Sequence, residues 1–213
     1  MSDSDAARRP RQFGTSRLEA FSDGVFAIAI TLLVLEISVP AGAETHLLRA
    51  VLDQWPSYLA YAVSFSTIGA VWVAHSAITE YLVGADLGLV RLNLLLLLVV
   101  SFLPFPTKLL AENVGETGPE RVAGTIYGVT LLMSSVLISV LWRYAVREGL
   151  VRPDAGDEEI RVVTERLTPS LFGYLTLILL GIFLPVIAVI GYLAIPLYLL
   201  LPFRRHRQRE TRQ

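Results

Sequence analysis

The sequence contains no cysteine, which excludes disulfide bonds and thiolate metal sites. Charged residues are also scarce, at 17% of the 213 residues, against roughly a quarter in an average soluble protein. The formal net charge is −1, so the charge balance gives no sign of a nucleic-acid partner. Hydrophobic residues are abundant instead, at 54%, and the mean hydropathy is +0.57. This composition indicates an integral membrane protein rather than a soluble domain.

Long apolar runs separated by prolines, glycines and charged stretches predict six membrane-spanning helices. Pro104 and Pro106 are expected to bend or break the end of the third span. In the fourth span, Gly124 and Gly128 have the small-x-x-x-small spacing that lets helices approach closely. The first four spans are expected at about residues 17–38, 56–81, 87–110 and 119–144.

The C-terminal apolar stretch, residues 169–203, is too long for one straight span. We therefore expect two short spans joined by a turn near Leu184 and Pro185. A polar stretch, residues 147–166, precedes them. Between the first and second spans, residues 45–53 carry apolar side chains at helical spacing, and this segment is expected to lie at the membrane interface. The chain is thus predicted to be all-α.

The positions of the basic residues test this layout independently. With an even number of spans, 15 of the 18 Lys and Arg residues fall on the side of the two termini, and the other three are Arg49, Lys108 and Arg121. The positive-inside rule then places both termini in the cytoplasm. We expect a cytoplasmic N-terminal tail, a six-helix transmembrane domain and a basic cytoplasmic C-terminal tail. Their bounds are residues 1–16, 17–203 and 204–213.

Charged and polar residues open the first span, where Arg17, Ser22 and Asp23 precede a long apolar run. Charges at this depth are costly unless they are paired or hydrated, so they mark function. The pattern Arg-x-x-x-Phe-Ser-Asp of residues 17–23 resembles the transmembrane protein 175 family of potassium channels, in its short, single-repeat bacterial form. The resemblance implies a homotetramer around the first helices in the bacterial inner membrane. It also implies no cofactor and no metal beyond transient potassium.

An apolar stripe runs along one face of the first helix, since Phe21, Val25, Ile28, Leu32 and Leu35 fall close to one line on a helical wheel. In an arbitrary membrane helix such a stripe would pack or face lipid. The family resemblance instead implies a hydrophobic pore constriction at Ile28, Leu32 and Leu35. A narrow apolar ring can block conduction by dewetting and penalises ions that hold their water tightly, so a modest preference for potassium over sodium is expected.

Two polar residues of the same helix have alternative roles. Thr31 lies next to the stripe, where its hydroxyl either faces a passing ion or bonds back to the carbonyl one turn earlier. Glu36, near the outer end, either forms an acidic ring at the pore mouth or is an ordinary solvated carboxylate. Three further acidic residues of the outer loop between spans three and four would add weakly to a cation-attracting field. They are Glu112, Glu116 and Glu120.

The polar residues at the inner end of the first helix need partners, and the second span supplies Trp72 and His75. These two residues are three apart and so share a helix face. Members of the resembled family carry a tryptophan and a histidine on the helix behind the first. We therefore expect Trp72 and His75 to bond to Ser22 or Asp23. With Arg17 and Phe21, they would form a structural network that holds the pore helix; on this hypothesis Asp23 is a buried acid on the face opposite the stripe.

Other function classes are less well supported by the residues. Intramembrane charges gather at helix ends, which favours a channel over the alternative of a secondary transporter for a small ion or solute. A ligand-binding or scaffolding membrane protein is a further alternative. An enzyme is not expected: Ser22 and Asp23 diverge by about 100° on a helix and cannot readily flank the His75 imidazole as in a triad. The common hydrolase, metalloprotease and phosphate-loop motifs are absent from the sequence.

Overall fold

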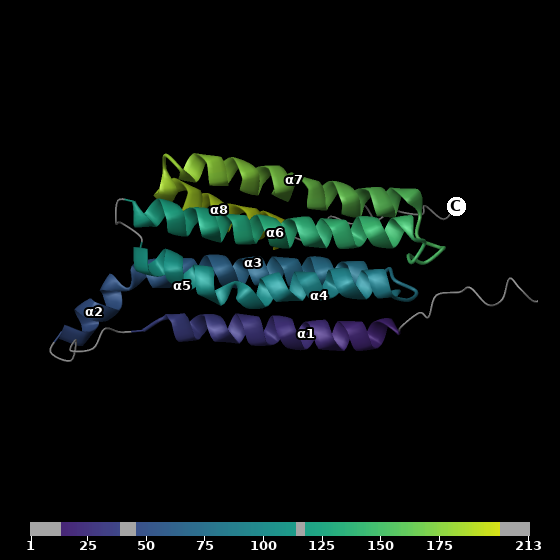
Figure 1. Ribbon diagram of the computed structural model, residues 1–213, viewed down its shortest axis with the longest axis horizontal. Helices are drawn as coiled ribbons and strands as arrows, with labels where there is room; N and C mark the ends of the chain where they lie inside the picture. The colour runs from purple at the N-terminus through teal and green to yellow at the C-terminus, as the bar shows by residue number, and fades with distance from the viewer. Residues whose placement is uncertain (1–13, 39–45, 114–117, 201–213) are drawn as a thin grey trace, which may run out of the picture.

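The computed structural model describes residues 14–38, 46–113 and 118–200 as a bundle of helices aligned along one axis (Figure 1). The predicted all-α class is confirmed for these residues. The predicted tails lie outside the described residues, apart from residues 14–16. The elements are α1 (Thr15–Leu32), the 3-10 helix η2 (Leu33–Glu36), α2 (Leu47–Asp53), α3 (Trp55–Thr79), α4 (Leu87–Phe102), α5 (Pro104–Asn113), α6 (Pro119–Arg147), α7 (Asp157–Gly181) and α8 (Pro185–Leu200).

Among the described residues, four segments are long and apolar enough to cross a membrane. They correspond to the first four predicted spans, with ends shifted by a few residues. The C-terminal helix α8 is apolar but has only 16 residues, or about 24 Å of helix, against a hydrocarbon core of about 30 Å. A count of six spans therefore stays a prediction. The four segments are Thr15–Glu36, Trp55–Thr79, Leu87–Asn113 and Pro119–Arg147.

Prolines end and start helices where the sequence predicts. The third span breaks between Phe102, the last residue of α4, and Pro104, the first of α5. A proline lacks the backbone N–H that would continue the preceding helix, but it fits a first turn, where that N–H is unpaired anyway. The C-terminal apolar stretch likewise turns between Gly181 and Pro185, as predicted. These two breaks set the lengths of α5 and α8.

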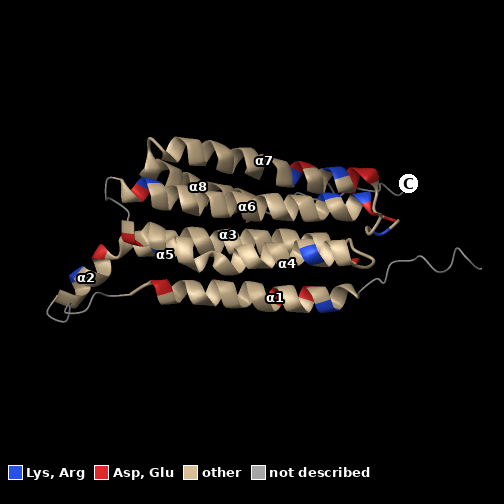
Figure 2. Ribbon diagram, in the orientation of Figure 1, with Lys and Arg blue, Asp and Glu red and all other residues tan. Residues whose placement is uncertain are grey.

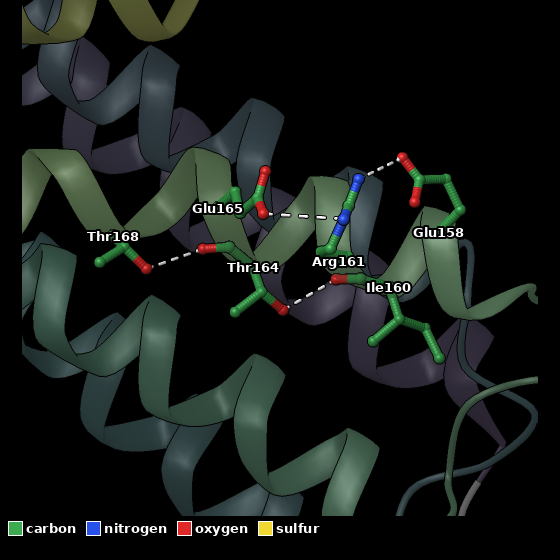
Figure 3. Close-up of polar contacts among 6 residues, drawn as sticks. All are labelled: Glu158, Ile160, Arg161, Thr164, Glu165 and Thr168. Carbon is green, nitrogen blue, oxygen red and sulfur yellow. Dashed lines mark hydrogen bonds and ion pairs between the residues drawn. The ribbon is translucent and has the colours of Figure 1, made fainter.

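The helix that contains the predicted fifth span is longer than the apolar stretch, because α7 begins at Asp157, inside the polar stretch, and continues through Pro169. Three acidic residues fill its first turn, where they interact favourably with the helix dipole. The Arg161 guanidinium then lies 2.9 Å from a carboxylate oxygen of Glu158 and 3.7 Å from one of Glu165 (Figure 3). Ion pairs three and four residues apart support a helix that hydropathy alone does not indicate.

The polar half of α7 also docks onto α6. The Thr164 hydroxyl donates to the carbonyl of Ile160 within α7 (Figure 3) and accepts a 2.9 Å hydrogen bond from the indole N–H of Trp142 on α6. The Thr168 hydroxyl donates back to the carbonyl of Thr164 in the same way. These threonine hydroxyls are satisfied within the bundle, so this polar stretch can pack as a helix against its neighbour.

The helix α1 lies at one edge of the bundle, where it packs on α3 and α4 (Figure 1). On the far side of these two helices, α6, α7 and α8 pack on one another. The short helix α2 projects sideways from the end of the bundle where α1 finishes. Buried side chains such as Leu33, Ile68, Leu96 and Trp142 form one core through these layers. Because α1 is an edge helix, only part of its surface is covered within one chain.

Basic residues gather at the end of the bundle where α1 begins and α8 finishes (Figure 2). The opposite end, with α2, α5 and the start of α6, holds the described residues Arg49, Lys108 and Arg121. The prediction that both termini lie in the cytoplasm is based on this distribution of basic residues. The described basic residues near the first end are Arg17, Arg91, Arg143, Arg147, Arg152, Arg161 and Arg166.

Candidate ion pathway along the first helix

The apolar stripe of α1 and η2 is uncovered within one chain. Ile28 is 60% exposed, Leu32 41% and Leu35 70%, and Phe21 is exposed as well. Val25, the remaining member of the stripe, is half-buried. Large apolar side chains that stand open along a whole helix face mark a surface for lipid, for another subunit or for a pore. The predicted constriction residues are thus on the free side of the edge helix.

A different face of α1 holds it to the bundle. Its buried residues are Ser22, Phe26 and Ala29, and Leu33 of η2 continues the same face. The Phe26 ring packs on the His75 imidazole of α3, with ring centroids 5.5 Å apart. Since this face carries the contacts to α3 and α4, the rotation of α1 about its own axis is fixed, and with it the direction of the stripe.

An open groove of about 400 Å³ lies between the stripe and α4. Its α1 side is formed by stripe residues from Phe21 to Leu32, and its α4 side includes Leu94, Leu98 and Ser101. The Ser101 hydroxyl donates to the carbonyl of Leu98, one turn earlier, so the groove wall is almost entirely apolar. A surface of this kind repels water and offers no ligand for a tightly hydrated ion.

Thr31 adopts the second of its two predicted arrangements. Its hydroxyl donates a 2.9 Å hydrogen bond to the carbonyl of Ile28, while the residue itself is exposed beside Leu32. A hydroxyl bonded back in this way keeps its oxygen lone pairs available on the exposed side. Thr31 is therefore a polar site next to two stripe residues.

The inner end of α1 is joined to α3 and α4 by a buried hydrogen-bond chain. The Ser22 hydroxyl donates to the Leu18 carbonyl (2.8 Å) and accepts from the Asn93 amide nitrogen of α4 (2.9 Å). The Asn93 amide oxygen lies 2.8 Å from Nε2 of His75 on α3. Ser22, Asn93 and His75 are each at most 1% exposed. The predicted bond from His75 to Ser22 or Asp23 is therefore wrong, because Asn93 stands between the two helices and bridges them.

Asn93 is a site residue that the sequence interpretation misses. The sequence feature that could have identified Asn93 is its polarity, since this amide directly precedes the apolar run Leu94–Val100 of the third span. A buried amide must find hydrogen-bond partners inside the bundle, which makes it a candidate bridge wherever it occurs in a membrane helix. Its partners depend on the packing of three helices and are not readable from spacing.

The predicted contact between Trp72 and Asp23 is present. The indole N–H of Trp72 on α3 donates a 2.8 Å hydrogen bond to a carboxylate oxygen of Asp23. Asp23 is exposed in the single chain, so its description as a buried acid is wrong: the core side of α1 lies between the stripe and Asp23. Arg17 is also exposed, and no described residue forms an ion pair or hydrogen bond with its side chain.

At the opposite end of the helix, Glu36 is paired. One of its carboxylate oxygens lies 3.6 Å from the Lys108 ammonium of α5. The outer-loop placement of two acidic residues needs correction as well, because Glu112 belongs to α5 and Glu120 is 7% exposed in the first turn of α6. Glu116 lies outside the described residues. Of the described acidic residues at this end, Glu36 is paired and Glu120 is buried, so these two contribute less to a cation-attracting field than the sequence suggests.

A second buried polar cluster lies behind α5. The Ser64 hydroxyl of α3 is 2.7 Å from the Thr107 hydroxyl of α5 and 2.7 Å from the Tyr127 hydroxyl of α6. All three residues are at most 2% exposed. The Thr107 hydroxyl also lies 2.7 Å from the Leu103 carbonyl, to which it donates. The cluster fixes α5 against α3 and α6.

A metal ion held by a protein requires several ligating side chains close together. No group of three or more His, Cys, Asp or Glu side chains that could hold a metal ion occurs among residues 14–38, 46–113 and 118–200. Ser22, Asn93 and His75 are hydrogen-bonded to one another, and Asp23 is hydrogen-bonded to Trp72. What the arrangement can do chemically is hold a long apolar surface in one orientation.

Comparison with known proteins identifies relatives of this arrangement. Residues 17–104 match the family model described as the endosomal/lysosomal potassium channel TMEM175. A potassium channel of Streptomyces collinus is 42% identical over 162 residues, covering 75% of this chain and 79% of that protein. A potassium channel of Chamaesiphon minutus is 43% identical over 169 residues, covering 76% of this chain and 83% of that protein.

A solved structure is similar as well. The crystal structure of a lysosomal potassium-selective channel TMEM175 homolog from Chamaesiphon minutus matches with a TM-score of 0.78 and 37% sequence identity. The match covers 87% of this chain and 95% of that one. The similarity therefore extends well beyond the first helices, to which the family model is confined.

Proposed function

The chain belongs to the TMEM175 family of ion channels, and from this premise we propose that it is a potassium-permeable channel of the bacterial cell membrane. Members of this family are channels rather than enzymes. The relatives named above are potassium channels, and the present chain covers most of their length. Potassium is accordingly the ion that we assign to the pathway.

The observation that carries this proposal is the uncovered apolar stripe on a helix fixed in rotation. In our assignment, four copies of the chain assemble with their α1 helices around a common axis. The side chains of Ile28, Leu32 and Leu35, exposed in one chain, would then form rings that narrow the pore. Such rings exclude water until an ion and its remaining hydration shell pass, and they admit potassium more readily than sodium.

We assign an anchoring role to the polar residues at the inner end of α1. The chain of Ser22, Asn93 and His75 fixes the helix from its buried side, and the bond between Trp72 and Asp23 holds it from the exposed side. With α1 clamped on both sides, the stripe points in one direction in every subunit. Arg17 and Phe21 lie on the exposed surface, where a neighbouring subunit or lipid headgroups would meet them.

The same proposal includes a six-span topology with both termini in the cytoplasm. Four segments satisfy the length and hydropathy of a full span, and α7 and α8 run alongside them as a hairpin (Figure 1). Seven described basic residues lie at the proposed inner end and three at the outer end. Labelling of single cysteines introduced at each end into the cysteine-free chain would test this sidedness directly.

The constriction is tested with the purified protein in liposomes, by measuring potassium efflux and the preference for potassium over sodium. We expect Ile28→Asn to raise flux or to weaken the preference for potassium, because a polar ring holds water that an isoleucine ring expels. Ile190→Asn on α8 is the matched control, since Ile190 is 57% exposed and Ile28 60%. If Ile28→Asn behaves like the parent protein, or if Ile190→Asn has the same effect, the assignment of the constriction is wrong.

A separate measurement distinguishes a channel from a transporter. Passive conduction predicts potassium efflux down its own gradient with no proton or sodium gradient present, with only a counter-ion pathway supplied. A strict requirement for a proton or sodium gradient would instead support the coupled transporter. The same liposomes serve for both experiments, so the ion and the mechanism are tested on one preparation.

A further inference from the structure

The ion pair between Glu36 and Lys108 joins the last residue of the pore-lining segment to the next layer of the bundle. The two charged groups are 3.6 Å apart, and the Glu36 side chain is only 24% exposed, against 54% for Lys108. Helix α5, which carries the lysine, also packs directly against η2, which carries the glutamate. The carboxylate that ends the pore helix therefore has a cation beside it in every subunit.

Lys108 is held in this place by its neighbour in the sequence. Thr107 is 2% exposed, and its hydroxyl bonds to the Leu103 carbonyl and lies against the Ser64 hydroxyl. Ser64 is in turn bonded to Tyr127, so α5 is fixed to both α3 and α6. Since α5 cannot rotate without breaking this cluster, Lys108 stays on the side of α5 that faces η2.

The other described charges at this end leave Lys108 as the cation paired with the pore helix. Arg49 pairs with Asp53 on α2, at 4.0 Å. Arg121, at the start of α6, is exposed and forms no ion pair with a described residue. An acidic mouth at Glu36 is therefore opposed by one specific lysine and not by a general excess of positive charge.

We propose that Lys108 sets the cation-attracting charge of the outer pore mouth by neutralising Glu36. This inference rests on the proposed function, which places η2 at that mouth. In a tetramer, loss of the lysine would leave four uncompensated carboxylates around one opening. Their field acts over about 30 Å at 10 mM salt but only about 3 Å at 1 M, so the effect on potassium entry must depend on ionic strength.

The test is potassium flux through the purified protein in liposomes, at about 10 mM and about 1 M potassium. Lys108→Gln is expected to raise the low-salt flux about threefold and to leave the high-salt flux unchanged. Glu36→Gln is expected to lower the low-salt flux by a similar factor, because the lysine is then uncompensated. Lys108→Arg keeps the charge and should behave like the parent protein, and Arg121→Gln controls for loss of a cation elsewhere at the same end.

Several outcomes would overturn the proposal. If Lys108→Gln and Glu36→Gln change the flux in the same direction, the pair only holds η2 in place. If Arg121→Gln raises the flux as much as Lys108→Gln does, the effect belongs to the whole surface. If the parent protein conducts at both salt concentrations and Lys108→Gln has the same flux, the role of Lys108 is refuted. The proposed channel function is not affected by that result. A parent protein with no flux above that of empty liposomes refutes the channel itself, and this inference with it.

Discussion

The two sides of the bundle are held together by different means. The contact of α1 with α3 and α4 is fastened by side-chain hydrogen bonds through Ser22, Asn93 and His75. The contacts among α6, α7 and α8 include hydrogen bonds too, such as that between Trp142 and Thr164, but they add close approach at glycines. A methyl group added at any of four glycines would meet a side chain of the neighbouring helix at or below ordinary contact distance; these are Gly128, Gly173, Gly181 and Gly191.

The difference reflects what each contact has to specify. Small residues let helices adhere in a membrane, where no hydrophobic force draws apolar surfaces together. Close packing is enough to hold the α7–α8 hairpin in place, because this hairpin lies away from α1. The edge helix α1 must also be fixed in its rotation about its own axis, because its apolar stripe has to face a single direction. A buried hydrogen bond has directional geometry and so fixes rotation as well as proximity.

The largest effect should come from the directional contact. Asn93→Leu removes the bridge and leaves the His75 and Ser22 groups without their shared partner, so we expect a loss of about 2–3 kcal/mol in the free energy of unfolding. Unfolding in mixed detergent micelles measures this. Asn113→Leu, at the end of α5, is the matched control and should cost less than about 1 kcal/mol. Equal stability of the two variants would show that the amide bridge does not fasten α1.

The close-packed contact is tested by one glycine pair. A Cβ at Gly128 would overlap the Tyr192 hydroxyl and Ile178, whereas nothing lies within 4 Å of a Cβ at Gly124. We expect Gly128→Ala to cost about 1–2 kcal/mol in the same unfolding measurement. Gly124→Ala should be neutral or slightly stabilising, because alanine is the better helix former. A similar loss from both substitutions would mean that helix flexibility, and not the approach of α7 and α8, is responsible.

The exposed hydrogen bond on α1 should contribute less than the buried bridge. Trp72→Phe keeps an aromatic ring and removes the N–H that Asp23 accepts, and we expect a loss of about 1 kcal/mol. Trp55→Phe is the control, since Trp55 is 52% exposed and Trp72 43%. The ratio of potassium to sodium flux should shift more for Trp72→Phe than for Trp55→Phe if this bond orients the stripe. Unchanged ratios in both variants would limit the anchoring role to the buried bridge.

The smallest effect on stability is expected at the ion pair. A partly exposed pair of this length is worth about 1 kcal/mol or less, so Lys108→Gln should lower the melting temperature very little, and less still at high salt. A large loss of stability would mean that this ion pair helps to hold α1 in place. It would count against the proposal that Lys108 sets the charge of the pore mouth.

Much of the fold follows from local chemistry along the chain. Prolines mark the starts of α5, α6 and α8 because their missing N–H is tolerated in a first turn, and hydropathy marks four spans. The early start of α7 does not follow from hydropathy, because this part of the helix is polar and carries ion pairs around Arg161. Hydropathy gives no signal for such pairs.

The candidate site divides in the same way. The Trp72–Asp23 bond is predictable because both residues belong to a motif with a family resemblance. Asn93 and Lys108 are not, since neither belongs to such a motif and each meets its partner only through the packing of the helices. The helical wheel places the stripe and Asp23 on different faces of α1. It cannot show which face of the helix packs on α3 and α4, so the prediction that Asp23 is buried does not match its exposure in the chain.

The hydrogen-bond chain at the inner end of α1 has one further consequence, which concerns protons. Because the Ser22 hydroxyl already donates to Leu18, it must accept from the Asn93 amide nitrogen, and the amide oxygen is left for an N–H of His75. The donor and the acceptor of each of these three hydrogen bonds are therefore fixed. An amide, unlike a hydroxyl or a water molecule, does not readily take up a proton on one side and release it on the other. Proton relays are one role of histidines buried in membrane bundles, but here the Asn93 amide separates His75 from the Ser22 hydroxyl.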